Sequence, residues 1–322
     1  MRAALVMPTL DAGPLLDRVL AGVAAQRSPG FAELVAIDSG STDGTRERLE
    51  RAGFRVAVIP RAEFDHGSTR DRAIAMTTAE VVVLLTQDAV PLGEDWLRSM
   101  LEPFADPRTA AVWCRQVPRP DCPPVIARRI REWLGDGDQP RVQELAPGET
   151  LENLAPAERL RRCALDNVAS ALRRAVWERF PLGPRRFGED LAFGMRAIAA
   201  GYRIVYQPRA VVEHSHSRTP FAEGKRTFCD HRNLREMVGL VTIPDWRTLR
   251  AALRDGTREH LAYVDSLGLP EPERTRVRRW TRAYVRWQCW AQYLGAKAGA
   301  KPGGLRGFLL ARLGRRLERG VG

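Results

Sequence analysis

An apolar strand that ends in a single carboxylate is the first feature of the sequence that could support chemistry. Residues 81–85 read Val-Val-Val-Leu-Leu, Asp88 follows after two polar residues, and Pro91 fixes the turn behind it. A carboxylate beside buried apolar residues is costly unless it is paired. A divalent cation that bridges the two phosphates of a sugar nucleotide would pair it, because such cations prefer hard oxygen ligands.

Asp38 ends another apolar run and begins a turn of small hydroxyl residues. This turn, 39–45, leads into a helical pattern, so Thr42 or Asp43 could serve as the helix cap. Alternatively, Asp38 accepts a hydrogen bond from the ring N–H of a uracil or thymine, and the turn shapes the pocket for the base. Spacing alone leaves both interpretations open.

The segment 63–72 reads Glu-Phe-Asp-His-Gly-Ser-Thr-Arg-Asp-Arg and places Gly67 at a helix entrance. Free backbone N–H groups and the helix dipole favour an anion at such a position. Arg70 and Arg72 could add bidentate contacts to a diphosphate. Most arginines on a helix simply face solvent, so the segment alone is weak evidence for either interpretation.

Glu189 and Asp190 lie side by side where a helix is expected to begin. Acidic residues at this position are commonly explained by their interaction with the helix dipole. The alternative is that one of them is a general base, which deprotonates an acceptor hydroxyl as it attacks the anomeric carbon of a sugar.

Two of the five histidines, His214 and His216, follow the short apolar segment 210–213 and share a face of it. One of them could bind a metal ion, and nitrogen ligation would then favour manganese over magnesium. A purely structural pair of histidines explains the pattern equally well.

The elements that would position these side chains alternate along the first hundred residues. We expect strands at 3–7, 33–38, 54–59 and 80–86, with helices at 14–26, 44–52 and 68–77. This order predicts βαβ units and an α/β fold with a mostly parallel sheet flanked by helices. Because ligands of such sheets bind beyond the carboxyl ends of the strands, we expect the polar strand ends to converge on one crevice.

The pattern loosens after residue 116 into Pro-, Gly- and Arg-rich sequence, which includes Gly135-Asp136-Gly137-Asp138 and predicts a long loop or lid. A helix at 191–200 and strands at 203–206 and 210–213 follow. We therefore expect a catalytic domain at 1–235 and a basic helical region at 236–322. Within the catalytic domain we expect a nucleotide-binding half (1–116), a loop or lid (117–160) and an acceptor and catalytic-base half (161–235).

Charge is distributed unevenly along the 322 residues, whose net charge is +12. Before Arg274 there are 38 basic and 38 acidic residues, whereas 13 basic residues and one acidic residue follow from there. A neutral body argues against a basic nucleic-acid binder. Five scattered cysteines predict neither a disulfide framework nor a zinc site. No export signal or membrane-spanning run is visible, which favours the reducing cytoplasm.

Apolar and aromatic residues recur at three-and-four spacing in the basic tail, where arginines occupy the other faces of the expected helix. The stripe consists of Val277, Trp280, Tyr284, Trp287, Ala291 and Leu294, and a second helix is expected at 305–317. Either this helix packs its stripe on the catalytic domain, or it binds an anionic membrane surface, where each nearby basic residue contributes about 1 kcal/mol.

Taken in order, these segments resemble those of the family 2 glycosyltransferases over residues 3–235, and more narrowly those of bacterial rhamnosyltransferases. The narrower resemblance lies in Phe-Asp-His-Gly at 64–67, Thr-Gln-Asp-Ala at 86–89 and Arg-Gln-Val-Pro-Arg-Pro at 115–120. It implies a GT-A fold and an inverting single displacement. The implied reaction moves L-rhamnose from dTDP-rhamnose to a hydroxyl of a glycan or polyprenyl-linked acceptor in cell-surface polysaccharide synthesis.

The resemblance also implies roles for individual residues. Asp190 is the expected base, and Glu189 beside it positions the acceptor or the helix. Asp88 and His214 are the expected ligands of a divalent cation, Mn²⁺ or Mg²⁺. The residues assigned to nucleotide-sugar binding are Pro8, Thr9, Asp38, Ser39, Gly67, Arg70, Gln87 and Asp88.

Two departures from the family pattern bear on these roles. Thr86-Gln87-Asp88 replaces Asp-x-Asp and removes one metal carboxylate, and Asp71 brings a negative charge where relatives often carry Asn. The alternatives to rhamnosyl transfer are transfer from another UDP-, dTDP- or GDP-sugar, and a membrane- or nucleic-acid-binding module that uses the basic tail. Nucleotidyl transfer ranks last, because no Gly-rich signature with a following Lys is present.

Overall fold

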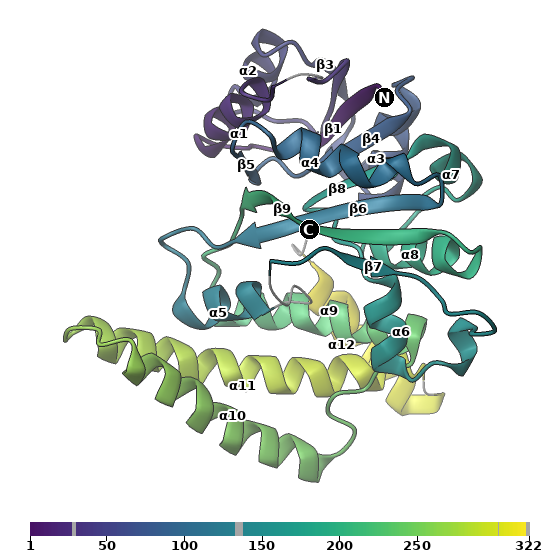
Figure 1. Ribbon diagram of the computed structural model, residues 1–322. Coiled ribbons are helices and arrows are strands. Elements are labelled where there is room, and N and C mark those ends of the chain that lie inside the picture. Colours follow the sequence, from purple (N-terminus) through teal and green to yellow (C-terminus); the bar gives the residue numbers. More distant parts are fainter. Residues whose placement is uncertain (28–29, 133–137, 302, 320–322) are drawn as a thin grey trace. The chain divides into compact units, whose positions relative to one another are not determined.

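The structure, a computed structural model, describes residues 1–27, 30–132, 138–301 and 303–319 (Figure 1). The chain divides into two compact units. The first comprises Met1–Arg119 and Ile130–Ser215, and the second comprises Pro120–Arg129 and His216–Gly322. This division by compactness is distinct from the functional boundary expected at residue 235, which stays a prediction.

A mixed sheet forms the centre of the first unit. Its strands follow the order β3 (Arg55–Val58), β2 (Glu33–Asp38), β1 (Ala3–Thr9), β4 (Val81–Leu85), β8 (Ala169–Arg173), β6 (Thr109–Val117), β9 (Arg203–Glu213) and β5 (Val90–Leu92), and β7 (Arg141–Gln143) also pairs with β9. The first four strands are parallel, as expected. The sheet becomes mixed at β8, which is antiparallel to both β4 and β6.

The core of the first unit explains why the strand sequences are so apolar. All five residues of β4 are buried, because the strand lies between β1 and β8 and is covered on both faces. Helices α1 and α4 contribute buried residues to the same core, among them Leu16 and the fully buried Trp96. A densely packed sheet of this kind holds the ends of its strands in fixed positions.

The helices of the first unit confirm the three that the N-terminal pattern predicts. The α-helices are α1 (Leu15–Ala24), α2 (Thr45–Arg51), α3 (His66–Ala75), α4 (Trp96–Leu101), α6 (Pro156–Cys163), α7 (Arg174–Arg179) and α8 (Glu189–Ala199), and short 3₁₀ turns cover Arg61–Glu63, Glu102–Ala105 and Leu151–Asn153. Helix α8 begins two residues before the predicted start, so Glu189 and Asp190 are its first residues.

Two predicted features differ from the structure. The loop expected at 117–160 contains helix α5 (Pro124–Glu132) and strand β7, and residues 135–137 of its Gly-Asp run lie outside the described residues. The strands expected at 203–206 and 210–213 form one strand, β9. Its pairing with β6 shifts register after Gln207, close to Pro208, which explains why the sequence pattern breaks there.

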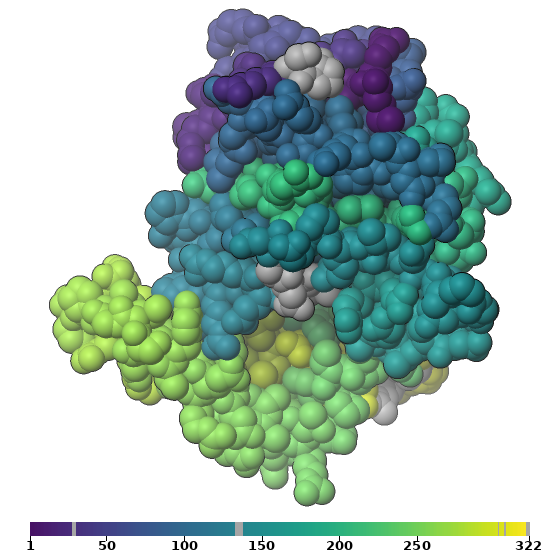
Figure 2. Space-filling view, in the orientation of Figure 1, coloured from purple at the N-terminus to yellow at the C-terminus, as the bar shows by residue number. Residues whose placement is uncertain are grey.

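The second unit is helical, with α9 (Pro220–Val238), α10 (Trp246–Ser266), α11 (Glu273–Gly299) and α12 (Gly304–Glu318). Helices α9 and α11 approach closely because glycines face the contact. A Cβ atom on Gly295 would lie 2.6 Å from the carbonyl oxygen of Phe228, and one on Gly299 would lie 2.5 Å from that of Arg232. Helices α10 and α11 form a hairpin, which is light green in the space-filling view (Figure 2).

The predicted stripe of the tail packs inside the second unit. Tyr284 and Ala291 are buried, and Trp287 contacts Phe221 of α9 edge to face, with ring centroids 4.9 Å apart. Helix α12 differs, because Leu305, Phe308 and Leu309 stay 75%, 58% and 55% exposed. Among the described helices, none combines the length and the apolar character needed to cross a bilayer.

The five cysteines are buried free thiols. Burial raises the pKa of Cys163 to about 12, and that of Cys229 and Cys289 to about 11. These thiols therefore stay protonated near neutral pH and are unreactive as nucleophiles.

Candidate functional site

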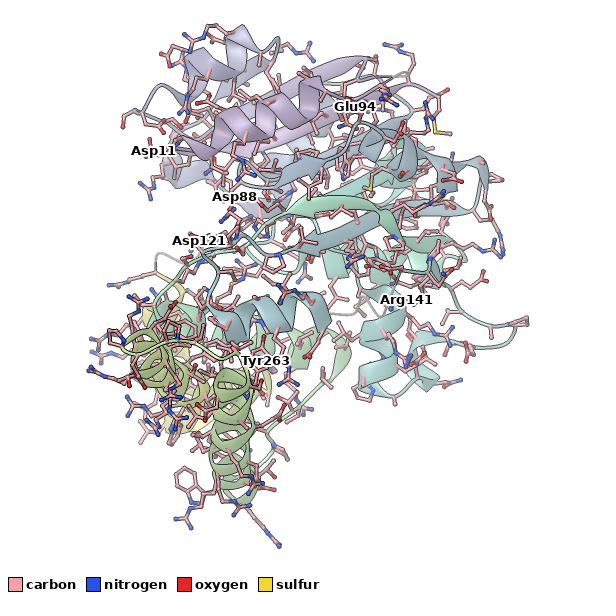
Figure 3. All side chains as sticks on the ribbon, turned by 60° about the vertical axis from the view of Figure 1, so that its left-hand side comes forward. Asp11, Asp88, Glu94, Asp121, Arg141 and Tyr263 are labelled. Atoms are coloured by element: carbon pink, nitrogen blue, oxygen red, sulfur yellow. The ribbon has the colours of Figure 1, made fainter. Side chains whose placement is uncertain are left out.

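The carboxyl ends of the parallel strands bring Thr9 and Asp38 together, as predicted. The two residues are paired in the register of β1 and β2, and the Thr9 hydroxyl donates a hydrogen bond of 3.0 Å to Asp38 Oδ1. Both side chains are buried. Figure 3 shows Asp11 and Asp88, which follow β1 and β4, on this same side of the sheet, whereas Glu94 lies away from it.

The carboxylate of Asp38 is fully engaged by the protein. Oδ1 accepts from the hydroxyls of Thr9 and Ser41, and Oδ2 accepts from the backbone N–H groups of Gly40 and Ser41, at distances between 2.5 and 3.0 Å. A carboxylate has about four acceptor positions, so a nucleobase N–H would have to replace one of these donors. Next to it, the buried Ser39 hydroxyl has no hydrogen-bond partner among the described residues.

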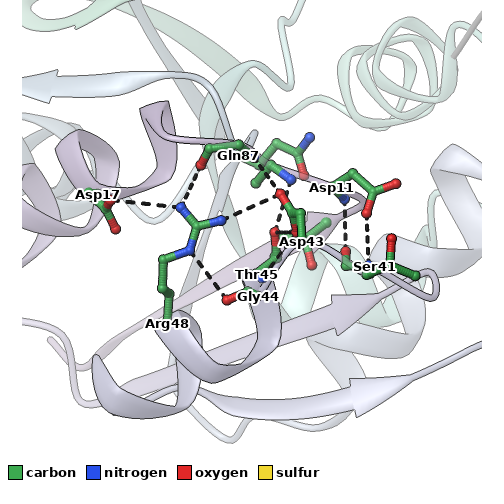
Figure 4. Close-up of polar contacts among 12 residues, drawn as sticks. Asp11, Asp17, Ser41, Asp43, Gly44, Thr45, Arg48 and Gln87 are labelled. Atoms are coloured by element: carbon green, nitrogen blue, oxygen red, sulfur yellow. Dashed lines mark hydrogen bonds and ion pairs between the residues drawn. The ribbon is translucent and has the colours of Figure 1, made fainter.

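The loop after β1 is held by a set of side-chain hydrogen bonds (Figure 4). Four consecutive backbone N–H groups, of Leu10, Asp11, Ala12 and Gly13, donate to Gln87, Ser41, Thr45 and Asp43 respectively, at 2.8 to 3.0 Å. Asp11 adopts a left-handed backbone with φ of 42°. These bonds stabilise a loop conformation that a residue other than glycine rarely adopts.

Gln87 uses both ends of its amide in this loop. Oε1 accepts from Leu10 N at 2.8 Å, and Nε2 donates to Leu10 O at 2.9 Å. In the structure its side chain thus binds the protein backbone. Nucleotide contact by Gln87 stays a prediction, and the observed contacts give it a role in holding the loop.

Arg70 and Glu189 form a buried ion pair between α3 and α8. Arg70 Nη1 lies 3.2 Å from Glu189 Oε1, and the two side chains are 5% and 8% exposed. Arg70 also donates to the carbonyl of His66 at 3.1 Å, while Asn167 Nδ2 donates to Glu189 at 3.2 Å. Glu189 is thereby charge-paired and hydrogen-bonded, and its pairing orients the start of α8.

The beginning of α3 also anchors the loop that precedes α8. Asp65 Oδ1 accepts from the backbone N–H groups of Ser68 and Arg185, both at 2.9 Å, and Gly67 N donates to the Arg185 carbonyl. A Cβ atom on Gly67 would lie 1.9 Å from the Gly183 carbonyl oxygen, so only glycine fits there. The contacts observed for Gly67 are therefore packing contacts, and its nucleotide contact stays a prediction.

Asp71 also holds the loop that precedes α8. Its carboxylate accepts from the indole N–H of Trp177 at 2.6 Å and from the backbone N–H groups of Leu182 and Gly183 at 3.0 and 2.8 Å. These three donors stabilise the ionised carboxylate and direct it toward α7 and the loop that follows.

Asp190, the predicted base, has a carboxyl group whose pKa is raised by its surroundings. Burial raises its pKa well above the usual range for aspartate, and the nearby charges of Glu189 and Asp166 raise it further. Asp190 as a whole residue is half-buried. A carboxylate with a raised pKa is a stronger base than an ordinary aspartate.

Asp88 and His214 meet because β5 pairs with β9. Val90 is opposite Glu213 in that pairing, and the turn that carries Asp88 therefore lies beside the end of β9. His214 Nε2 is 3.5 Å from Asp88 Oδ2, and His214 is buried. Carboxylate oxygen and imidazole nitrogen together suit Mn²⁺.

Several residues around this site were present in the motifs, but the sequence indicated no role for them. Gln116 links His214 to Asp166, and Arg119 Nη1 donates to the Asp88 carbonyl at 3.1 Å. Ser170 donates to Asn167, which in turn contacts Glu189. The residues in these contacts are 3 to 98 positions apart along the chain. Most of the contacts are therefore visible only in the folded structure.

Comparison with known proteins places the chain among glycosyltransferases. The family model described as Glycosyl transferase family 2 matches residues 4–167. The O-antigen chain rhamnosyltransferase RfbN of Salmonella typhimurium is 32% identical over 71% of this chain and 71% of its own length. The O-antigen chain rhamnosyltransferase WbaN of Salmonella anatum is 33% identical over 70% of this chain and 69% of its own length.

Solved structures show the same fold at lower identity. A mannosyltransferase from Pyrobaculum calidifontis, in complex with GDP-Man and Mn²⁺, has a TM-score of 0.53 and 21% identity and covers 99% of this chain and 80% of its own. Glucosyl-3-phosphoglycerate synthase from Mycobacterium tuberculosis, in complex with Mn²⁺, UDP and phosphoglyceric acid, has a TM-score of 0.52 and 19% identity over 76% and 80% of the chains. The predicted GT-A fold is confirmed.

Proposed function

Because this chain belongs to glycosyl transferase family 2, we propose that it is an inverting enzyme that moves L-rhamnose from dTDP-rhamnose to a hydroxyl of a glycan or lipid-linked acceptor. The observation that carries the rhamnosyl assignment is the similarity to two O-antigen rhamnosyltransferases across about 70% of the chain. The role that fits these relatives is a step in cell-surface polysaccharide synthesis.

The nucleobase site in this proposal lies beyond β1 and β2. Pro8, Thr9, Asp38 and Ser39 lie there, and the Ser39 hydroxyl is the group with an unused hydrogen-bonding capacity. The loop 10–13 is fixed before the nucleotide arrives, which lowers the entropic cost of binding.

The diphosphate site is proposed at Asp88 and His214, which would be ligands of a divalent cation. The donor set fits, because a carboxylate oxygen and an imidazole nitrogen face each other at a distance too long for a hydrogen bond. A divalent cation bound there would neutralise the leaving diphosphate. Arg119 Nη1, bonded to the Asp88 carbonyl, provides a positive charge close by. The proposed approach of Arg70 to the nucleotide would require Arg70 to keep Glu189 paired at the same time.

The base in the proposed mechanism is Asp190. Its carboxylate takes the proton of the acceptor hydroxyl, the acceptor oxygen attacks the anomeric carbon, and the nucleoside diphosphate leaves from the opposite face. Glu189 is less suited to the role, because Arg70 and Asn167 occupy its carboxylate. A single displacement of this kind inverts the configuration at the anomeric carbon.

A test of the donor begins with binding. We expect dTDP-rhamnose with Mn²⁺ to stabilise the protein by about 2.7 kcal/mol at a hundredfold its dissociation constant, and UDP- or GDP-sugars at the same concentration to stabilise it less. Transfer to a lipid-linked glycan should give a product of inverted anomeric configuration by NMR. Stabilisation by a GDP-sugar alone would overturn the sugar assignment, and a retained configuration would overturn the single displacement.

We propose a membrane contact for α12, in place of the α11 stripe, whose residues Tyr284 and Ala291 are buried and whose Trp287 contacts α9. Leu305, Phe308 and Leu309 are exposed at helical spacing, and the exposed Arg312, Arg315 and Arg316 follow them. Apolar insertion and attraction to anionic lipid would act together and would bring the enzyme to a polyprenyl-linked acceptor.

Sedimentation with vesicles tests this contact. We expect binding to vesicles with anionic lipid, loss of binding in Leu305→Ser/Phe308→Ser/Leu309→Ser, and no loss in Val142→Ser, which removes an exposed apolar residue of β7. Equal binding by all three proteins would exclude α12 as the contact.

A further inference from the structure

We propose that Gln116 and Asp166 are positioning residues that fix the tautomer of His214 and so aim its Nε2 lone pair at Asp88. The three side chains form a hydrogen-bonded series from Asp166 through Gln116 to His214. This inference rests on the proposed metal site, because it explains how one of the proposed ligands is prepared for the cation.

The direction of the series is set at Asp166. Its Oδ1 accepts from the backbone N–H of Val168 at 2.9 Å, and its Oδ2 lies 2.5 Å from Gln116 Nε2. An ionised carboxylate only accepts hydrogen bonds, so the amide nitrogen of Gln116 must face it. The amide oxygen of Gln116 must therefore face away from Asp166.

That amide oxygen lies 2.9 Å from His214 Nδ1. An amide oxygen cannot donate, so Nδ1 carries the hydrogen, and a neutral imidazole then has a lone pair on Nε2. Nε2 lies 3.5 Å from Asp88 Oδ2. With its lone pair on Nε2, the imidazole and the Asp88 carboxylate could serve as ligands of the same cation, and a partner that fixes the other ring nitrogen is typical of metal-binding histidines.

The sheet holds this series rigidly. Gln116 and His214 are at the ends of the paired strands β6 and β9, and His214 N also donates to the Val117 carbonyl at 2.9 Å. Asp166 comes just before β8, the other neighbour of β6. Both ends of the Gln116 amide are therefore held between adjacent strands, and His214 itself is only 7% exposed.

Asp166→Asn tests which groups donate and which accept in this hydrogen-bonded series, because asparagine has nearly the same shape as aspartate. The introduced amide can keep its oxygen on the Val168 N–H, but its NH₂ group then faces Gln116, whose own amide must turn over. The Gln116 NH₂ group would donate to His214 Nδ1, and the imidazole proton would move to Nε2. We expect Nδ1–H in the natural protein and Nε2–H in Asp166→Asn, measured by imidazole ¹⁵N shifts in metal-free protein.

The same variant should bind Mn²⁺ about 10- to 100-fold more weakly, measured by electron paramagnetic resonance without donor, as is typical for loss of a residue that orients a metal ligand. Gln116→Leu should weaken Mn²⁺ in the same range and leave the tautomer mixed. Asp95→Asn removes the same charge from a largely exposed position and should change neither measurement.

An unchanged Nδ1–H tautomer in Asp166→Asn would overturn the inference, as would equal loss of Mn²⁺ affinity in Asp95→Asn. Absence of Mn²⁺ binding in the natural protein would instead overturn the proposed metal site, while the tautomer measurement would still decide whether Asp166 and Gln116 set the state of His214.

Discussion

Arg70 and Glu189, which are 119 positions apart in the chain, form an ion pair of 3.2 Å that is almost completely buried. The pair joins the helix of the Phe-Asp-His-Gly segment to the helix that carries the proposed base. Because Glu189 is adjacent to Asp190, the positive charge of Arg70 on α3 compensates one of the two carboxylates at the start of α8.

Arg70→Met is expected to destabilise the protein by about 3–5 kcal/mol, because removal of one partner leaves a buried charge uncompensated. The measurement is the free energy of unfolding in urea. Arg70→Met/Glu189→Leu, which removes both charges, should recover most of that loss. If the double variant is less stable than Arg70→Met, the pair is held by packing and its charges do not dominate.

Asp190→Asn is expected to abolish transfer and leave donor affinity nearly unchanged, because loss of a base affects the chemical step and not ground-state binding. Single-turnover rates and equilibrium donor binding separate the two effects. Glu189→Gln is the comparison, since it keeps Asp190. Turnover retained in Asp190→Asn would transfer the role of base to another group.

Asp190→Asn should also raise the thermal stability of the protein at pH values above the usual pKa of aspartate. Burial and the charges of Glu189 and Asp166 raise the pKa of Asp190 in the folded state, so the folded protein favours the protonated carboxyl. That contribution is complete below the unfolded pKa and is lost as pH rises through the folded pKa. We expect the melting temperature of Asp190→Asn to exceed that of the natural protein at pH 8 and the gap to close at low pH. A constant gap would contradict the assignment.

Gln87→Leu is expected to weaken nucleotide binding about 10- to 100-fold, because two hydrogen bonds that hold the loop 10–13 are lost at about 1 kcal/mol each, together with the order that they impose. Mn²⁺ binding without nucleotide should not change. Gln26→Leu is a matched control, since Gln26 also uses both amide ends on backbone groups, of Gly93 and Leu97. Equal loss of nucleotide affinity in both variants would indicate general destabilisation.

His231 on α9 should make the second unit sensitive to acid. Burial lowers its pKa from 6.5 to about 4. Between these two pH values, His231 is therefore protonated in the unfolded chain and neutral in the folded chain. Stability is therefore lost as pH falls from 6.5 toward 4, by a total on the order of 3 kcal/mol. His231→Gln should flatten this part of the stability curve and match the natural protein at pH 8. A parallel curve in the variant would place the acid sensitivity elsewhere.

Much of the N-terminal architecture could be predicted from the sequence because its signals are local. Apolar runs and their polar ends located β1, β2 and β4, and the family resemblance is confirmed by the family match. The second half was harder. Helix α5 lies in Pro- and Arg-rich sequence, and β7 has only three residues, which is too short for an alternation to be visible.

The contacts of single side chains could be predicted less well, because they depend on partners that are distant in the chain. Arg70 and Gly67 read as anion-binding residues from helix position alone, yet their observed contacts are with Glu189 and Gly183. Gln87 occupies a motif position, but its amide binds Leu10. Only the arrangement of the strands showed that Gln116 joins His214 to Asp166.

The close contact of Gly67 with the Gly183 carbonyl limits how this enzyme can be recombined with its relatives. The segment at 181–188 fits only against a helix that begins without a side chain at position 67 and carries Asp65 and Asp71 to hold it. A chimera that exchanged residues 161–235 alone would bring the loop of one parent against the helix α3 of another. Exchanges should therefore keep residues 63–72 and 177–190 from the same parent, as one inherited block.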